Sequence, residues 1–334
     1  MSANEKKWTK ALSVYKYADN TRGSFELILT ASLFFAAWTG TWLAMQYSVW
    51  LGLLATIVPA VFLVRIFAIQ HDCGHQALFS AKPVNDWIGR ALGVLTFTPY
   101  DVWKHAHAIH HAGSGNLDRR DLGEITTLTV EEYQSRSLLG RLAYRIYRNP
   151  ITLFVIGPAY MFLLQHRLPI GMMKKGLVPW LSTQLTNLAI LAIALLMIWL
   201  VGWADFLLIQ IPVVAIGASI GVWLFFVQHQ FEETHWSRSD IWQRENAALH
   251  GSSYYDLPKP IMWLTGNIGI HHVHHVAANI PFHRLPQTLK DYPELKEIGR
   301  LTLWQSIKCV PLSLWDEQRK ELISFRQFRK QFAA

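Results

Sequence analysis

Two pairs of long apolar stretches constrain the fold of this chain more than any other feature of its sequence. A helix of about 20 apolar residues is long enough to cross the hydrocarbon core of a bilayer. The stretches cover residues 24–45, 49–69, 184–202 and 206–228. Only a short turn separates the two members of each pair, so the sequence predicts two transmembrane hairpins.

The basic residues predict how these hairpins are oriented. All of the 31 Lys and Arg residues except Arg65 lie outside the hairpins, in residues 1–23, 71–183 and 229–334. Cytoplasmic segments carry the excess of Lys and Arg, so we expect both termini and the middle segment in the cytoplasm. Arg65 lies near the end of the second stretch, where we expect its side chain to reach the lipid headgroups.

These features predict an all-α integral membrane protein with four transmembrane helices. We expect residues 71–183 and 229–334 to form a helical cap on the cytoplasmic side, and residues 1–334 to form a single domain. The net charge of +8 follows from the topology, so we expect no nucleic-acid partner.

Three short histidine clusters lie in the predicted cap. They are HDCGH at residues 71–75, HAIHH at 107–111 and HHVHH at 271–275. On a helix, residues three and four apart share one face, so each cluster can direct two or three imidazoles to one point. The second and fourth spans end on the same side of the membrane, and His229 directly follows the fourth. The sequence therefore predicts one histidine-rich site just below the lipid.

The number of these histidines predicts two metal ions. The candidate ligands are His71, His75, His107, His110, His111, His229, His271, His274 and His275. Nine ligands exceed the usual four to six of a single ion. Imidazole suits iron, and iron supports redox chemistry that zinc does not, so we predict a pair of Fe²⁺/Fe³⁺ ions in the cap. His105 and His272 are out of register and are expected to be neighbours of the site.

Metal-bound imidazoles usually donate their second ring N–H to an acceptor. Acidic residues close to the clusters in sequence are therefore candidates for this supporting role. They are Asp72, Asp101, Asp118, Glu232 and Glu233.

Several ordered blocks of the sequence resemble the membrane fatty-acid desaturase family, in particular its bacterial acyl-lipid branch of the omega-6 or delta-12 type. The blocks are HDCGH at 71–75, HAIHH followed by GNLDRR at 107–120, TLTVEEY at 127–133, FFVQHQFEE at 225–233, GSSYYDLP at 251–258 and TGNIGIHHVHH at 265–275. The resemblance implies a four-span fold with a cytoplasmic cap over a di-iron centre, in which the nine histidines are the ligands. It also implies O2 as co-substrate and a cis double bond placed in an acyl chain of a membrane lipid or another acyl carrier, in the inner membrane of a bacterium.

The sequence departs from the family pattern beside His229. Relatives that bind acyl-CoA have an asparagine four residues before this histidine as a water-mediated ligand, whereas this chain has Phe225. Asn267, four residues before His271, is the available substitute. No haem-binding cytochrome b5 segment of the HPGG kind is present, so we expect a separate electron donor such as a ferredoxin, a cytochrome b5 or a rubredoxin-like carrier.

Two other functions stay open at this point. Related histidine-rich membrane enzymes hydroxylate or ketolate carotenoids or alkanes, although GNLDRR and GSSYYDLP favour a desaturase. A haem carrier or a metal transporter would place histidines within its spans. The four stretches contain no histidine, which argues against that class.

Overall fold

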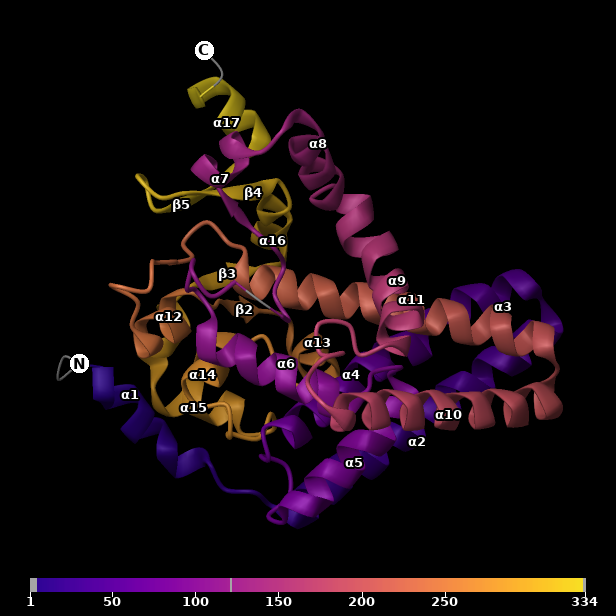
Figure 1. Cartoon of the computed structure of the whole chain (residues 1–334). Coiled ribbons are helices and arrows are strands. Elements are labelled where there is room, and N and C mark those ends of the chain that lie inside the picture. Colours follow the sequence, from indigo (N-terminus) through magenta and orange to yellow (C-terminus); the bar gives the residue numbers. More distant parts are fainter. Residues whose placement is uncertain (1–4, 121, 333–334) are drawn as a thin grey trace.

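A computed structural model describes residues 5–120 and 122–332 of the protein. Within this part of the chain, four helical segments are long and apolar enough to cross a membrane. They are α2 (Asn20–Tyr47), α3 with α4 (Val49–Ala55 and Ile57–Gly74), α10 (Leu177–Val201) and α11 (Trp203–His229). In Figure 1 these helices extend together to the right, and most of the other elements lie to the left. The four spans and two hairpins predicted from the sequence are confirmed.

The first hairpin is tight because α2 and α3 approach each other closely at Gly52. A Cβ atom on residue 52 would lie 2.8 Å from the Cα atom of Met45, which is too close for two carbon atoms. Ser48 joins the two helices in an extended conformation. Glycine at position 52 therefore permits the sharp reversal between the first two spans.

The helix α10 begins at Leu177, earlier than the predicted start at residue 184. Ser182, Thr183 and Gln184 are polar, but they lie within the helix. Thr183 is fully buried, and Ser182 Oγ accepts a hydrogen bond from the backbone N–H of Asp101 at 3.2 Å. The first turns of α10 therefore pack against the cap and not against lipid. Their residues need not be apolar, so an apolar stretch does not reveal where this helix begins.

The cap is mostly helical, as predicted. Its helices before α10 are α1 (Glu5–Ala11), η1 (Leu12–Tyr15), α5 (Lys82–Leu95), α6 (Tyr100–Gly113), α7 (Val130–Ser135), α8 (Leu138–Tyr147), η2 (Thr152–Ile156), α9 (Gly157–Leu163) and η3 (Gln165–Arg167). Those after α11 are α12 (Arg244–His250), α13 (Lys259–Leu264), α14 (His271–Val276), α15 (Leu285–Asp291), η4 (Pro293–Glu297), α16 (Leu303–Cys309) and α17 (Phe325–Phe332).

The cap also contains two small sheets that the sequence did not predict. Their strands are β1 (Leu128–Thr129), β2 (Tyr254–Asp256), β3 (Arg300–Thr302), β4 (Leu312–Asp316) and β5 (Glu321–Ser324). The strand β1 pairs in parallel with β4, which pairs antiparallel with β5, while β2 and β3 pair in parallel. Strands of two to five residues are too short for an alternating pattern to be recognised.

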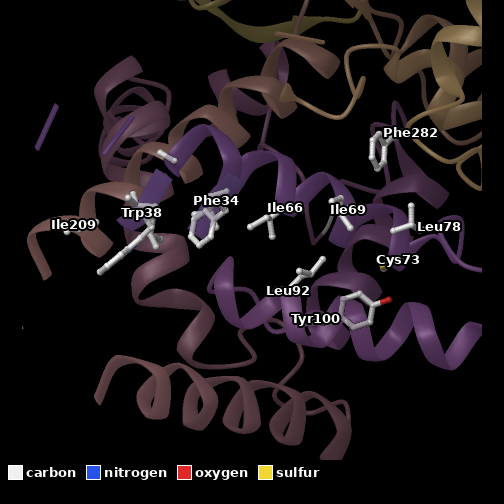
Figure 2. Close-up of a cluster of buried hydrophobic side chains, with 14 of the residues drawn as sticks. Phe34, Trp38, Ile66, Ile69, Cys73, Leu78, Leu92, Tyr100, Ile209 and Phe282 are labelled. Atoms are coloured by element: carbon white, nitrogen blue, oxygen red, sulfur yellow. The ribbon is translucent and has the colours of Figure 1, made fainter. Parts of the chain in front are cut away.

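The helix α4 runs through the centre of the largest buried cluster. Figure 2 shows Ile66 and Ile69 of α4 in one cluster with Phe34 of α2 and Leu92 of α5. Tight packing on several sides restrains a helix from shifting or rotating. Because α4 ends in the first histidine cluster, this packing fixes the direction in which those imidazoles point.

Arg65 is buried in α4, so the expectation that it reaches the lipid headgroups was wrong. Its Nη2 donates to Glu26 Oε2 of α2 at 2.6 Å, and its Nε donates to Thr30 Oγ1 at 3.1 Å. The remaining Nη1 donates to the backbone carbonyl of Trp263, whose ring centroid lies 3.9 Å from the guanidinium carbon. Arg65 therefore joins the first two spans to the helix α13 of the cap.

Candidate metal centre

Nine histidine side chains converge in two groups at the ends of α4 and α11. They are the nine histidines predicted as ligands, and within each group the ligand atoms lie within 4.8 Å of one another. The five-histidine group consists of His71, His75, His107, His111 and His274, and the four-histidine group consists of His110, His229, His271 and His275.

The helices α6 and α14 each divide their histidines between the two groups. In α6, His107 and His111 are one helical turn apart and join the five-histidine group, while His110 joins the other group. In α14 the division is reversed, because His271 and His275 join the four-histidine group and His274 the five-histidine group. The HxxHH spacing therefore lets one short helix contribute to two adjacent sites.

In the five-histidine group the Nε2 atoms gather around His107. Its Nε2 lies 2.9 Å from the Nε2 atoms of His71 and His75 and 3.1 Å from that of His111. One ring proton bridges only one such pair, so hydrogen bonds alone do not account for this convergence.

The four-histidine group has the same spacing around His229. Its Nε2 lies 3.0 Å from His271 Nε2 and 3.2 Å from His110 Nε2. Two nitrogens bound at a right angle to one ion, each about 2.1 Å from it, would lie roughly 3.0 Å apart. The donor atoms therefore fit one metal ion in each group.

Burial keeps the imidazoles outside the spans neutral. It lowers the pKa of His110 to about 4. Burial, and then the charge of neighbouring histidines, holds the pKa well below its usual value for His75, His107, His111, His271, His274 and His275. Neutral imidazole is the form that binds metals, so these nitrogens are available at neutral pH.

Acceptor oxygens lie near the outer ring nitrogens of His229 and His71. Gly251 O lies 3.3 Å from His229 Nδ1. Asp72 Oδ1 lies 3.7 Å from His71 Nδ1, and Asp72 Oδ2 accepts a hydrogen bond from the backbone N–H of Phe282 at 2.6 Å. Asp72 is thus the acid predicted from the sequence that the structure places beside a group histidine.

The other predicted supporting residues have different surroundings. Asp101 accepts two hydrogen bonds from Arg90, each 3.0 Å long. Asp118 accepts from Arg238 and from the backbone N–H of Ser239. Asn267 Nδ2 donates to the carbonyl oxygen of Phe282 at 3.2 Å. Glu232 and Glu233 are exposed. These contacts hold parts of the cap together and do not involve a group histidine.

Glu124 was missed by the sequence reasoning. Its Oε1 lies 3.4 Å from the outer nitrogen, Nδ1, of His110. Glu124 lies in an irregular segment between α6 and β1, and no helical spacing relates it to His110. Proximity in sequence to a histidine cluster, the signal used for the other acids, does not extend that far.

The two histidines expected to be neighbours of the site lie outside both groups. His105 is exposed on α6. His272 is buried, and its Nε2 lies 2.8 Å from the carbonyl oxygen of Leu295. This neutral hydrogen bond gives His272 a structural partner away from the convergent nitrogens.

Aromatic rings close the space around the groups. The ring of Phe225 lies 5.1 Å from the rings of both His110 and His229, so the position held by asparagine in acyl-CoA relatives is apolar here. The ring of Trp103 stacks on His107 at 4.8 Å. A Cβ on Gly74 would lie 2.7 Å from this indole, so glycine at position 74 makes room for it.

A cavity adjoins the four-histidine group. Its wall includes His110 and His229 together with apolar side chains and several polar ones. Other lining residues are Ser114, Asn116, Leu117, Arg120, Glu124, Ile125, Thr127, Phe225, Gln230 and Trp236. The candidate metal centre is therefore accessible from a partly apolar space inside the cap.

Comparisons with known proteins agree with this arrangement. Residues 48–305 match the sequence profile of the fatty acid desaturase family. A "Fatty acid desaturase" of Bacillus subtilis is 43% identical over 326 residues, covering 97% of this chain and 92% of that protein. An "sn-1 acyl-lipid omega-3 desaturase (ferredoxin)" of Nostoc sp. is 28% identical over 258 residues, covering 75% and 69% of the two chains. An "sn-1 oleoyl-lipid 12-desaturase" of Synechocystis sp. is 24% identical over 264 residues, covering 73% and 69%.

The family match covers most of the chain, from the second span to the cap beyond α14. It includes all nine histidines of the two groups. Together with the four membrane-spanning helices, these findings show that the chain belongs to the fatty acid desaturase family and is a membrane oxidoreductase with a histidine-cluster di-metal site.

Proposed function

We propose that the protein is an O2-dependent di-iron desaturase that introduces a cis double bond into an acyl chain of a membrane lipid. The observation that carries this proposal is the pair of histidine groups at the ends of α4 and α11, next to the membrane. An unactivated C–H bond in an acyl chain does not react with ordinary acids and bases. Two irons with O2 would supply the oxidising power to remove two hydrogens from adjacent carbons.

The donor set fits iron, and the proposed oxidation needs a redox-active metal. All nine candidate ligands are imidazoles, which suit iron, and neither group contains a thiolate. The protein's own contribution is to hold the neutral rings in place and to exclude water from them. Phe225 and Trp103 do this by covering the imidazoles with apolar rings.

The location of the two histidine groups suits an acyl chain as substrate. They lie at the ends of α4 and α11, where a chain from the bilayer would reach them. We place the cap and both termini on the cytoplasmic side of a bacterial inner membrane, following the distribution of basic residues. A basic cytoplasmic surface suits an acidic electron carrier. The name of the Nostoc relative includes ferredoxin, so a ferredoxin is the first candidate donor, before a cytochrome b5 or a rubredoxin-like carrier.

For the position of the double bond we propose delta-12, or omega-6. The sequence blocks shared with that branch support it, as do relatives named oleoyl-lipid 12-desaturases at 24% and 23% identity. The relative at 43% identity has a name that gives no position. Bond position depends on how far the acyl chain extends past the metals, so a direct measurement decides it.

Expression in a host that makes only saturated and monounsaturated fatty acids will test this function. With an electron donor supplied, we expect new dienes with a cis bond at the delta-12 position. Fatty-acid methyl esters analysed with double-bond localisation will show it. A new bond at another position would overturn the delta-12 assignment alone. A hydroxylated or ketolated product without new unsaturation would instead support the hydroxylase or ketolase alternative.

The purified protein will contain about two iron ions per chain. The two histidine groups each fit one ion, and their nitrogens are neutral at the pH of purification. Mass spectrometry of the metals, with the protein concentration from amino-acid analysis, gives the ratio. A Soret absorption band in place of this iron would contradict the di-iron proposal and indicate haem.

A further inference from the structure

The two histidine groups contain no carboxylate ligand. Nine neutral imidazoles do not cancel the positive charge of two divalent ions. A charge in a buried site is stabilised only when a countercharge or several hydrogen bonds lie close to it. A di-metal site of this kind therefore needs negative charge immediately outside its ligands.

Two carboxylates satisfy this need, one for each group. Asp72 lies beside His71 of the five-histidine group, and Glu124 lies beside His110 of the four-histidine group. Across residues 5–120 and 122–332, the structure places no other carboxylate oxygen within 4.0 Å of a group histidine. The countercharge is thus distributed over both groups, although the two acids come from unrelated segments.

The backbone before Glu124 is built to approach His110. Gly123 has φ +87°, a left-handed conformation that favours glycine. A Cβ atom on residue 123 would lie 3.2 Å from the carbonyl oxygen of Ala106 and 3.7 Å from His110 Cβ. The segment therefore packs directly on α6 at His110, and this brings the Glu124 carboxylate to the outer face of that ring.

The His110 ring directs one nitrogen into the four-histidine group and the other away from it. Its Nε2 lies 3.2 Å from His229 Nε2, inside the four-histidine group. Its Nδ1 is buried and makes no hydrogen bond to the described residues, and Glu124 Oε1 lies 3.4 Å from it. An acceptor at Nδ1 favours the tautomer with its proton there, which leaves the Nε2 lone pair free to bind a metal.

We propose that Glu124 is a positioning residue of the metal site in the four-histidine group. When the ion is bound, Glu124 would accept the Nδ1–H of His110, hold the ring with Nε2 directed inward, and offset the charge of the ion. This inference rests on the proposed di-metal site. It extends that site to a residue outside the histidine clusters and makes the retention of one of the two ions depend on it.

Release of iron to a chelator will test this role. We expect Glu124→Gln, which is nearly isosteric but neutral, to release one of the two ions about 10-fold to 100-fold faster than the unmodified protein, because loss of an outer partner weakens metal binding by that factor. The second ion should be released at the unmodified rate. Glu124→Ala should release the same ion at least as fast as Glu124→Gln. Glu233→Gln changes an exposed carboxylate and is the matched control.

Thermal unfolding of the metal-free proteins separates positioning from a general structural role. We expect metal-free Glu124→Gln to unfold at the temperature of the metal-free parent, and the added stability on loading with iron to be smaller. The proposal would be overturned if folded Glu124→Gln and Glu124→Ala both release their two ions at the rates of the unmodified protein. Faster release from Glu124→Ala alone would also overturn it, because the charge would then have no effect. If the unmodified protein itself binds no iron, the proposed function fails before any variant is compared.

Discussion

Replacing His274 or His110 by alanine will abolish desaturation and lower the iron content. His274 belongs to the five-histidine group and His110 to the four-histidine group, so each substitution removes one nitrogen from a different site. Both side chains are buried, and alanine offers no donor atom to replace the lost one. We expect new unsaturated products to fall below detection and iron to fall from about two ions per chain to about one or fewer. Product analysis and metal analysis of the same preparations will measure both effects.

His105→Ala is the matched control for these substitutions. His105 lies on the same helix as His110 but is exposed and belongs to neither group. We expect it to retain iron and activity close to those of the unmodified protein. Full activity in His274→Ala or His110→Ala would refute the assignment of that side chain as a ligand.

Removing the negative charge of Glu26 will strongly destabilise the protein. Glu26 Oε2 accepts from Arg65 at 2.6 Å, and the Arg65 side chain is 1% exposed. In Glu26→Gln the guanidinium stays buried with only neutral acceptors, Thr30 Oγ1 and the carbonyl of Trp263. Removing one partner of a buried ion pair costs about 3–5 kcal/mol. Thermal or denaturant unfolding in detergent should show a decrease of this order in the free energy of unfolding.

Substitution of the partner, Arg65, and the double variant make this prediction specific. Arg65→Met should cost less, because Arg22 Nη2 also contacts Glu26 Oε1 at 2.5 Å and remains to balance the carboxylate. Combining Glu26→Gln with Arg65→Met should recover part of the stability lost in Glu26→Gln, because no unpaired charge then remains buried. If the loss of unfolding free energy in the double variant equals the sum of the losses in the two single variants, the two side chains do not interact. Arg22→Gln, at a half-exposed residue, should change stability by about 1 kcal/mol or less.

The membrane spans could be predicted because lipid imposes a length and a composition on them. The limits of that prediction are seen where helices contact protein instead of lipid. The start of α10 was missed because Thr183 is buried against the cap and not in lipid. Arg65 was expected at the headgroups because its partners Glu26 and Trp263 are distant in sequence, and no local pattern indicates that they meet.

The candidate ligands could be predicted because spacings of three and four residues place side chains on one face of a helix. Their division into a five-histidine and a four-histidine group could not, because it depends on how the tertiary fold places α6 and α14 relative to each other. His110 and His274 occupy the same place in their HxxHH clusters yet enter different groups. Glu124 was missed for a related reason, since the conformation of Gly123 and the packing on Ala106 bring it to His110.

The contacts of Arg65 also impose an order on the biosynthesis of this protein. Glu26 and Thr30 leave the ribosome before Arg65, so the ion pair can form as soon as the first hairpin has been made. Trp263 follows Arg65 by 198 residues, and it is translated only after the second hairpin. During that interval the newly inserted hairpin holds a cation with one of its acceptors not yet synthesised. The first two spans therefore enter the bilayer without the contact to Trp263, which forms only after the segment that contains α13 has been made.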